Sequence, residues 1–464
     1  DLNGNTVGFN ATVAQSFQLS TTANGSRSVD GSVGDSRVLS QFGRLNYDFK
    51  GKYLLTASIR RDGEDKFGPE NKWGDFPSIS GGWRLSEEDF IKHSLPGLSN
   101  LKIRGGYGAL GNDGALGQFL YQPSYSSLNI NAFSPGDRSQ GWGLVIFPNA
   151  AIKWEEVDQT DIGVDLGLMQ NRLTFTADWY SRQTHNMIYN VSTPPSAGIG
   201  NYNGAPAQIP VNIGQVSNKG FELAIGYTDH AGDFQYSINA NASFNTNKVL
   251  KLGFDSIPIL NGGAGPGGVW NGPTSITQVG HPMGAFYGYI ADGIFKSDAE
   301  AASSVQPNAH AGDLRYRDLN KDGVISNADQ TYIGNPWPKM VYAFNVNLSW
   351  KNFDIQMLFT GVQGVDIYNG NKATTESLYG DYNTTRDIFK TSFFNGNGLT
   401  NLPSVGHFDN GTPPQFVNDP NGNYKNISSF FIENGSYLKL KNLQIGFNIP
   451  KKMLQNIKLS SVRI

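Results

Sequence analysis

The feature that most constrains this chain is an alternation of very short and very long connections between segments with period-two hydrophobicity. In MVYAFNVNLSW, residues 340–350, apolar side chains alternate with Asn and Ser. The segment FDIQMLFTG, residues 353–361, repeats the pattern after only Lys351-Asn352. Such alternation is typical of strands with one apolar face, and so short a link predicts a β-hairpin.

Other hairpins are predicted around Lys50-Gly51, around Gln170-Asn171 and at DHAGD, residues 229–233. We expect about thirteen strands in all. Between the hairpins lie long polar connections, at roughly 20–39, 62–76, 111–156, 190–215, 246–339 and 365–435.

A transmembrane β-barrel explains this alternation. Such barrels have short periplasmic turns, long extracellular loops, and strands of ~10 residues that are apolar toward lipid and polar toward the lumen. Only a closed barrel satisfies strand backbones in lipid. We therefore predict an all-β, antiparallel transmembrane barrel. A soluble multi-domain β-protein that binds glycans is the alternative.

Composition limits the other classes. The 464 residues include 56 glycines and 12% aromatics, which fits many strands with irregular connections. A net charge of −3 without a basic tract argues against nucleic acid as a partner, and the lack of cysteine excludes disulfides. The chain begins at Asp1 without a signal-peptide pattern and reaches its end, SSVRI, inside a strand pattern. We expect residues 1–464 to be an incomplete barrel domain.

The long connection 246–339 contains DLNKDGVISNAD, residues 318–329. Its oxygen spacing is that of a calcium-binding loop, with Gly323 at the sharp turn. The loop falls outside the cell in this topology, where calcium sites can be weak, ~10⁻⁴–10⁻³ M. We predict a structural calcium ion, although an Asp/Asn/Gly turn without metal is the alternative. The predicted ligands are Asp318, Asn320, Asp322, the Val324 carbonyl, Ser326 and Asp329.

No pattern predicts catalysis. The G-x-G-x-x-G spacing in NGGAGPGG lacks the strand and helix of a dinucleotide site, and we interpret it as a flexible loop. The histidines are scattered, and no G-x-S-x-G elbow occurs. The adjacent carboxylates Glu87-Glu88 and Glu155-Glu156 would point to opposite faces of a strand. We predict that the protein is not an enzyme.

The aromatic residues divide into two predicted groups. Those at strand ends are interpreted as an interfacial girdle, namely Trp83, Tyr107, Trp179, Tyr180, Trp350 and Tyr437. Aromatic residues in the long loops could stack on sugar rings or could pack the loops together. The candidate substrate contacts among them are Trp142, Trp270, Tyr287, Tyr289 and Trp337.

Several blocks, in order along most of residues 40–464, resemble SusC/RagA-like TonB-dependent outer-membrane transporters. They include FPSISGGWRLSEEDF, LKIRGGYGALGN, NRLTFTADWYSRQTHNMIY, NIGQVSNKGFELAI, GAFYGYIADGIF and FIENGSYLKLKNLQIGFNIP. The resemblance implies a 22-stranded barrel in the outer membrane of a Gram-negative bacterium, with an N-terminal plug in its pore. On this basis we expect the plug, the TonB box and the last strands to be missing from this segment.

The resemblance also implies partners. A SusD-like surface lipoprotein would form a lid, and the TonB–ExbB–ExbD system would supply energy through the missing plug region. The family imports oligosaccharides or oligopeptides, and we expect oligosaccharides here. The alternatives are an oligopeptide importer of the same family and a non-transporting, calcium-stabilised glycan-binding protein or adhesin.

Overall fold

The computed structural model describes residues 37–113, 116–117, 120–132, 139–192, 196, 208–253, 257–262, 272–376, 385–386, 422–454 and 459–464. Its main feature is an 11-stranded sheet in which all neighbours are antiparallel. The strands, in their order in the sheet, are β1 (Val38–Phe49), β2 (Tyr53–Glu64), β3 (Trp73–Arg84), β4 (Leu98–Asn112), β7 (Glu155–Leu168), β8 (Leu173–Ser192), β9 (Gln208–Ala231), β10 (Phe234–Lys251), β17 (Met340–Trp350), β18 (Phe353–Gln363) and β21 (Tyr437–Phe447).

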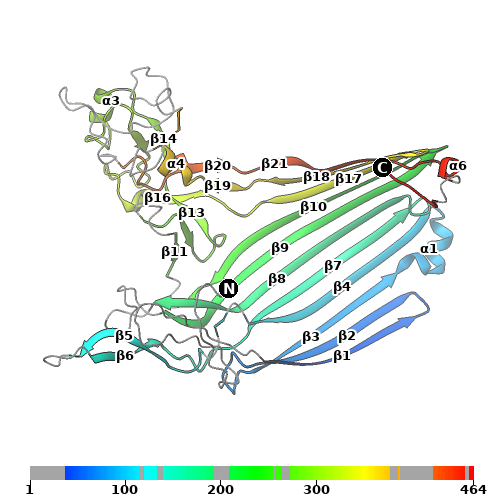
Figure 1. Ribbon diagram of the computed structural model, residues 1–464, viewed down its shortest axis with the longest axis horizontal. Helices are drawn as coiled ribbons and strands as arrows, with labels where there is room; N and C mark the ends of the chain where they lie inside the picture. The colour runs from blue at the N-terminus through cyan, green and yellow to red at the C-terminus, as the bar shows by residue number, and fades with distance from the viewer. Residues whose placement is uncertain are drawn as a thin grey trace, which may run out of the picture.

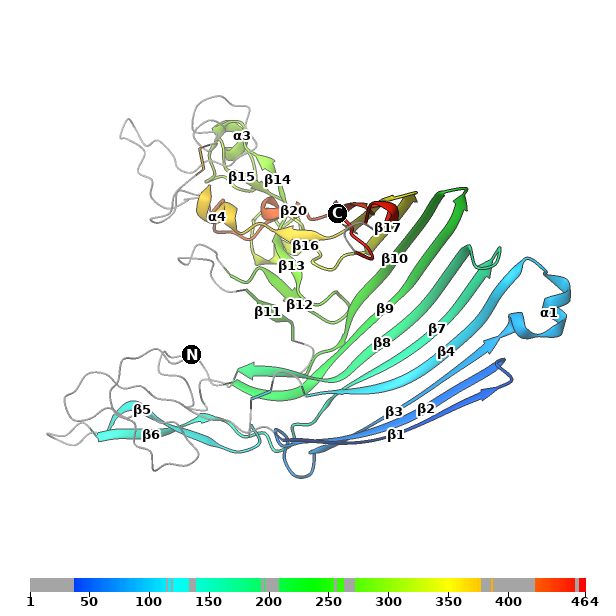
Figure 2. The same cartoon turned by 45° about the vertical axis from the view of Figure 1, so that its right-hand side comes forward.

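The sheet is curved, and its connections separate onto two ends (Figures 1 and 2). The short turns lie at one end, the predicted periplasmic side, and the long connections leave from the other. Strands β8, β9 and β10 contain 20, 24 and 18 residues. A tilted membrane strand needs only about 9–11 residues, so these three extend beyond a bilayer. The predicted antiparallel barrel architecture is confirmed.

The tight turns depend on residues that adopt a positive φ. Lys50 and Gly51 have φ of 56° and 65°, and the Gly51 N–H donates to Asp48 Oδ1 at 2.7 Å. Lys351, in the turn between β17 and β18, has φ 53°. A positive φ gives a hairpin turn the twist of its flanking strands. This local chemistry explains why four hairpins were predictable from the sequence.

One face of the sheet is apolar and exposed. Ile225 in the middle of β9 is 50% exposed, and Phe344 and Phe359 stack on this face with ring centroids 4.5 Å apart. An exposed apolar surface of this extent marks contact with another apolar phase, here the lipid that the strand pattern predicts. Exposed members of this outer face include Leu45, Leu55, Ile59, Ile79, Ile103, Ile162, Phe221, Ile238 and Ile445.

The predicted girdle is partly confirmed and partly wrong. Trp83 and Trp350 lie at strand ends and are 38% and 54% exposed. Tyr180 instead lies on the polar face, where its hydroxyl donates to Asn245 Oδ1 at 3.0 Å. Adjacent residues of a strand point to opposite faces, so Trp179 and Tyr180 could not both face lipid.

Two long connections build one unit at the end of the sheet opposite the short turns, which we call the cap (Figure 1). The main sheet has 11 strands where about thirteen were expected, and the short strands of the cap pair outside that sheet. The elements of the cap are β11 (Ile259–Asn261), β12 (Ser275–Thr277), β13 (Ala285–Tyr289), β14 (Ala291–Ile294), α3 (Asp298–Ala302), β15 (Leu314–Tyr316), η4 (Asn327–Asp329), β16 (Gln330–Gly334), β19 (Asp366–Tyr368), α4 (Asn371–Thr375), η6 (Ser429–Phe431) and β20 (Ile432–Asn434).

Buried polar contacts join the two connections of the cap. Asn423, fully buried, accepts from the Leu314 N–H at 2.8 Å and donates to Asp313 Oδ1 at 2.9 Å. The Tyr289 N–H donates to the Ile427 carbonyl at 2.8 Å. Buried hydrogen bonds of this kind are costly to leave unmade, so the segment beginning at residue 422 is fixed onto the connection that precedes β17.

The remaining elements are small. Strands β5 (Ser124–Ala132) and β6 (Ser139–Ile146) form a separate hairpin. At the periplasmic end, η1 (Leu85–Glu87) and α1 (Asp89–Ser94) link β3 to β4, and α6 (Lys451–Leu454) follows β21. No helix among the described residues is long and apolar enough to cross a membrane.

A lysine should destabilise the protein on the outer face of the sheet and be tolerated on the polar face. Ile225→Lys places a charge on the outer face and should cost about 2–4 kcal/mol. The neighbouring Ala224→Lys places it on the polar face, beside Asn241 of β10, and should cost much less. The temperature at which the folded, SDS-resistant form is lost should fall for Ile225→Lys alone. Equal losses for both variants would contradict the assignment of faces.

Candidate functional site

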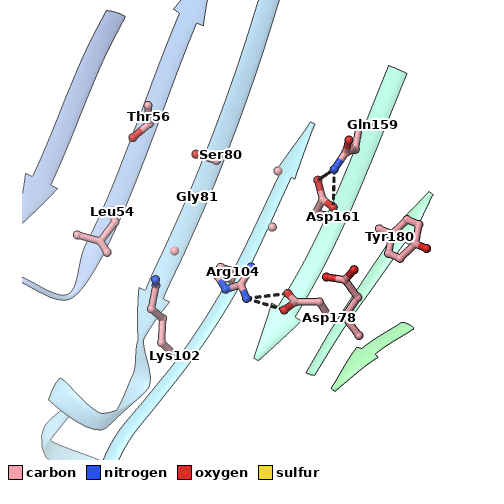
Figure 3. A pocket seen from close by; sticks show the side chains of 14 residues that line it. Leu54, Thr56, Ser80, Gly81, Lys102, Arg104, Gln159, Asp161, Asp178 and Tyr180 are labelled. Carbon is pink, nitrogen blue, oxygen red and sulfur yellow. Dashed lines mark hydrogen bonds and ion pairs between the residues drawn. The ribbon is translucent and has the colours of Figure 1, made fainter. Parts of the chain in front are cut away.

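The polar face of the sheet is hollowed into a groove of about 520 Å³ that crosses β2, β3, β4, β7, β8 and β9. Figure 3 shows side chains from these strands pointing into it, with Lys102 and Arg104 on one side and Asp161 and Asp178 on the other. A second groove of about 550 Å³ shares Gln159 and Asp161 with the first. The polar face therefore offers a continuous lumenal surface.

Arg104 joins three strands of this wall. Its Nε donates to Asp165 Oδ2 at 3.2 Å, and its Nη2 donates to Asp178 Oδ2 at 2.8 Å. The side chains of Arg104, Asp165 and Asp178 are 34%, 25% and 19% exposed. Solvent screens partly exposed ion pairs, so we assign this network to fixing side-chain geometry more than to stability.

Gly163 makes the Arg104–Asp178 contact possible. It lies directly opposite Arg104 on one side and Asp178 on the other. A Cβ atom at Gly163 would lie 2.0 Å from Asp178 Oδ1 and 2.9 Å from Arg104 Cζ. The two side chains meet above this glycine because nothing else occupies the space.

Carboxylates outnumber cations around this network. Asp161 accepts from Gln159 Nε2 at 3.1 Å, and Glu222 accepts from Ser243 Oγ at 3.3 Å. Neither forms an ion pair within the part of the chain that the structure describes. This part of the wall has a negative potential that favours cationic groups.

The wall becomes amide-rich across β10, β17, β18 and β21. Asn239 faces Asn345, and Gln356 lies between Asn347 and Gln444 in the pairing of these strands. Amide side chains supply both donors and acceptors without charge. Such a surface can hydrogen-bond hydroxyl and peptide groups of a neutral solute.

The calcium-type loop is closed by its own side chains. Asp318 Oδ1 accepts from the Lys321 N–H at 2.6 Å, and Oδ2 accepts from the Gly323 N–H at 2.9 Å. Asp322 Oδ1 accepts from the Val324 N–H at 2.9 Å, and Asn320 Nδ2 donates to Asp322 Oδ2 at 2.8 Å. Gly323 has φ 83°, as the sharp turn requires.

Asp329 anchors the end of this loop. It is fully buried, and its oxygens accept from the backbone N–H groups of Leu319 at 2.9 Å and Ser326 at 2.8 Å. With Ser326 it forms the capping box of η4. These backbone donors, Ser326 first, hold the pKa of Asp329 below its usual value, so it remains an anion at neutral pH.

The donor chemistry of the loop fits a hard cation, because every predicted ligand atom is an oxygen. A carboxylate oxygen that accepts one N–H keeps a second lone pair for an ion. Within the described residues, no group of three or more His, Cys, Asp or Glu side chains is arranged to hold a metal ion. The calcium ion therefore stays a prediction based on spacing.

The predicted aromatic contacts lie in different surroundings. Tyr287 is half-buried edge-on to Tyr332, and Trp337 Nε1 donates to the Met283 carbonyl at 2.7 Å. Tyr289 is only 9% exposed and packs inside the cap, which leaves little of its ring for a sugar. Trp270 and the Trp142 side chain lie outside the described residues. The substrate role of all five stays a prediction.

Gly163 gives a direct test of the charged wall. Gly163→Ala should separate Arg104 from Asp178 and, by overpacking, cost about 1–3 kcal/mol. Gly105→Ala is the matched control, because the nearest atom to its Cβ is a carbonyl oxygen at 3.6 Å. Thermal unfolding in detergent should detect a loss for Gly163→Ala only. A Gly163→Ala protein as stable as Gly105→Ala would show that the close contact is absent.

Comparisons with known proteins agree with this architecture. The chain is 31% identical over 435 residues to TonB-dependent receptor P3 of Formosa agariphila, covering 93% of this chain and 40% of that relative. It is 28% identical over 416 residues to TonB-dependent receptor SusC of Bacteroides thetaiotaomicron, covering 89% of this chain and 38% of SusC. The chain thus spans less than half the length of these relatives.

Among solved structures, that of the RagAB peptide transporter matches with a TM-score of 0.72 at 23% identity, over 92% of this chain and 43% of that chain. At this identity the match supports the fold. The family described as "TonB dependent receptor-like, beta-barrel" matches residues 1–296. The chain belongs to this family of TonB-dependent receptor β-barrels, of the SusC type.

Proposed function

We propose that the protein acts in TonB-dependent import of oligosaccharides across the outer membrane of a Gram-negative bacterium. The observation that carries this proposal is the polar lumenal wall of a chain that belongs to the TonB-dependent receptor barrels. The grooves on that wall are open surfaces lined by side chains from many strands. Such a surface suits a solute that passes along it.

The amide-rich half of the wall favours a neutral, polyhydroxylated substrate. Asn239, Asn345, Asn347, Gln356 and Gln444 belong to adjacent strands of this half. Sugar hydroxyls can both donate to and accept from such side chains without the loss of a counter-ion. Tyr287 of β13 and Trp337, just before β17, are candidates for stacking on a sugar ring.

Oligopeptide import is the second candidate. The structure whose fold matches well is a peptide transporter by its title, and the charged wall around Arg104 could pair with charged side chains or peptide termini. A non-transporting glycan-binding protein or adhesin is disfavoured by membership in a family of receptor barrels. We propose no enzymatic activity, since the family whose model matches is described as a receptor barrel.

We also propose the partners of this function. A SusD-like surface lipoprotein would cover the cap, and the TonB–ExbB–ExbD system would supply the energy through a plug region. SusC is among the relatives of this chain, which supports both partners. The cap is suited to a lid contact because buried hydrogen bonds fix its two connections to each other.

Uptake by cells tests the substrate class. A strain that lacks the gene should lose uptake of some member of a size series of labelled oligosaccharides and keep uptake of oligopeptides. Re-expression of the wild-type gene should restore uptake, and a variant with Asn345→Leu and Asn347→Leu should restore it several-fold less well. Loss of peptide uptake with intact glycan uptake would favour the second candidate.

We propose that calcium orders the loop at 318–329. Millimolar calcium should slow hydrogen exchange of the loop amides about tenfold or more, since a bound ion lowers the population of open states. Half of the effect should appear at ~10⁻⁴–10⁻³ M. Magnesium is the control ion, and Asp318→Asn with Asp322→Asn should abolish the response. Equal exchange with calcium and with a chelator would contradict the site.

A further inference from the structure

One connection at the periplasmic end differs from its neighbours. Most turns there are short hairpin loops, whereas β3 and β4 are linked by η1 and α1. Helix α1 has six residues and none of them is buried. Phe90 is 60% exposed and Leu95, at its C-cap, is 51% exposed. So short a helix is marginal in water on its own, and its exposed apolar side chains point to a partner surface.

Glu88, the N-cap residue of α1, ties the helix to the lipid-facing side of the sheet. Its carboxylate accepts from Tyr53 Oη at 2.8 Å, Lys52 Nζ at 3.0 Å and Trp83 Nε1 at 3.1 Å. Tyr53 and Trp83 are exposed members of the outer face. The hydrogen bond from Tyr53, then those from Lys52 and Trp83, lower the pKa of Glu88 to about 2, so this tie is complete at neutral pH.

The ring of Trp83 ends a row of aromatic side chains on β1, β2 and β3. Successive ring centroids are 6.5 Å apart from Tyr47 to Phe49, 6.4 Å from Phe49 to Tyr53 and 6.2 Å from Tyr53 to Trp83. Aromatic rows at strand ends lie at the level of the lipid headgroups. The start of α1 therefore lies at the membrane interface.

The neighbouring turn extends the apolar surface. The Met169 N–H donates to the Gly97 carbonyl at 3.3 Å, which places the turn between β7 and β8 beside the end of the α1 connection. Met169 is 60% exposed. Lys50, at the other side, lies over the ring of Phe49 at 5.2 Å and can reach a phosphate. Apolar side chains with nearby cations suit an anionic phospholipid surface.

We propose that the α1 connection is an interfacial anchor, in which Phe90 and Leu95 enter the periplasmic leaflet of the outer membrane at the boundary between headgroups and acyl chains. The partner is the phospholipid leaflet, because the connection continues the aromatic row that already contacts lipid. Glu88 sets the orientation of the helix relative to that row. This anchor would fix how deep the barrel sits in the membrane, and the proposal does not depend on which substrate is transported.

Site-specific spin labels test the anchor. These 464 residues contain no cysteine, so Phe90→Cys, Leu95→Cys and Asp89→Cys each introduce a single thiol into this part of the protein. The protein is taken from the cell's outer membrane and reconstituted in vesicles of phosphatidylethanolamine and phosphatidylglycerol. Labels at 90 and 95 should be reached several-fold better by oxygen than by a water-soluble nickel complex. The label at 89, which lies about 100° around the axis of α1 from Phe90 and about 120° from Leu95, should show the reverse preference.

Two outcomes would overturn the proposal. Labels at 90 and 95 as accessible to nickel as the label at 89 would place the helix in water. Labels inaccessible to both reagents would show that protein, rather than lipid, covers the helix.

Two variants of the labelled Phe90→Cys protein test the role of Glu88. Adding Glu88→Ala should release the helix and shift the label at 90 toward the aqueous value. Adding Glu87→Ala removes a contact of Lys92 alone, at 2.8 Å, and should leave the label in place. Equal behaviour of the two variants would reject Glu88 as the tie.

Discussion

The structure depends on one requirement, that the backbone N–H and C=O groups of every strand in lipid find partners in the neighbouring strands. In the described residues, the nine inner strands of the main sheet meet it by pairing on both edges, and the outermost strands β1 and β21 each pair on one edge. Because side chains then alternate between faces, one alternating sequence supplies both an apolar lipid contact and a polar wall. The polar wall and the lipid-facing surface are therefore the two faces of one sheet, formed by alternate residues of the same strands.

The parts of this fold that depend on local chemistry could be predicted from the sequence. The hairpin at Lys351 needed only period-two segments and a short turn, and the loop at 318–329 needed only its oxygen spacing. Faces were harder to assign without the strand register, which is why Tyr180 was placed with Trp179 in the girdle. Helix α1 was missed because its six residues give no helical periodicity, although Glu87-Glu88 before it are poor strand residues.

The charged wall could not be predicted, because it depends on the alignment of three strands. Arg104, Asp165 and Asp178 are brought together by the register of β4, β7 and β8. In the sequence, each of the three segments has a charged residue at a polar position. This shows which face the residue lies on, but it does not show which charged residues pair. The role of Gly163 could not be predicted, because it arises only from the two side chains of other strands that meet above it.

The buried contacts of Asn423 have a mechanical consequence. The two connections that it joins begin and end on β10, β17, β18 and β21, which are adjacent in the sheet. The cap is therefore attached to the sheet by four adjacent strands. A force on the cap is shared among four hydrogen-bonded strands, and any tilt of the cap must bend that side of the wall. Load applied to the cap thus reaches the amide-rich half of the polar wall directly.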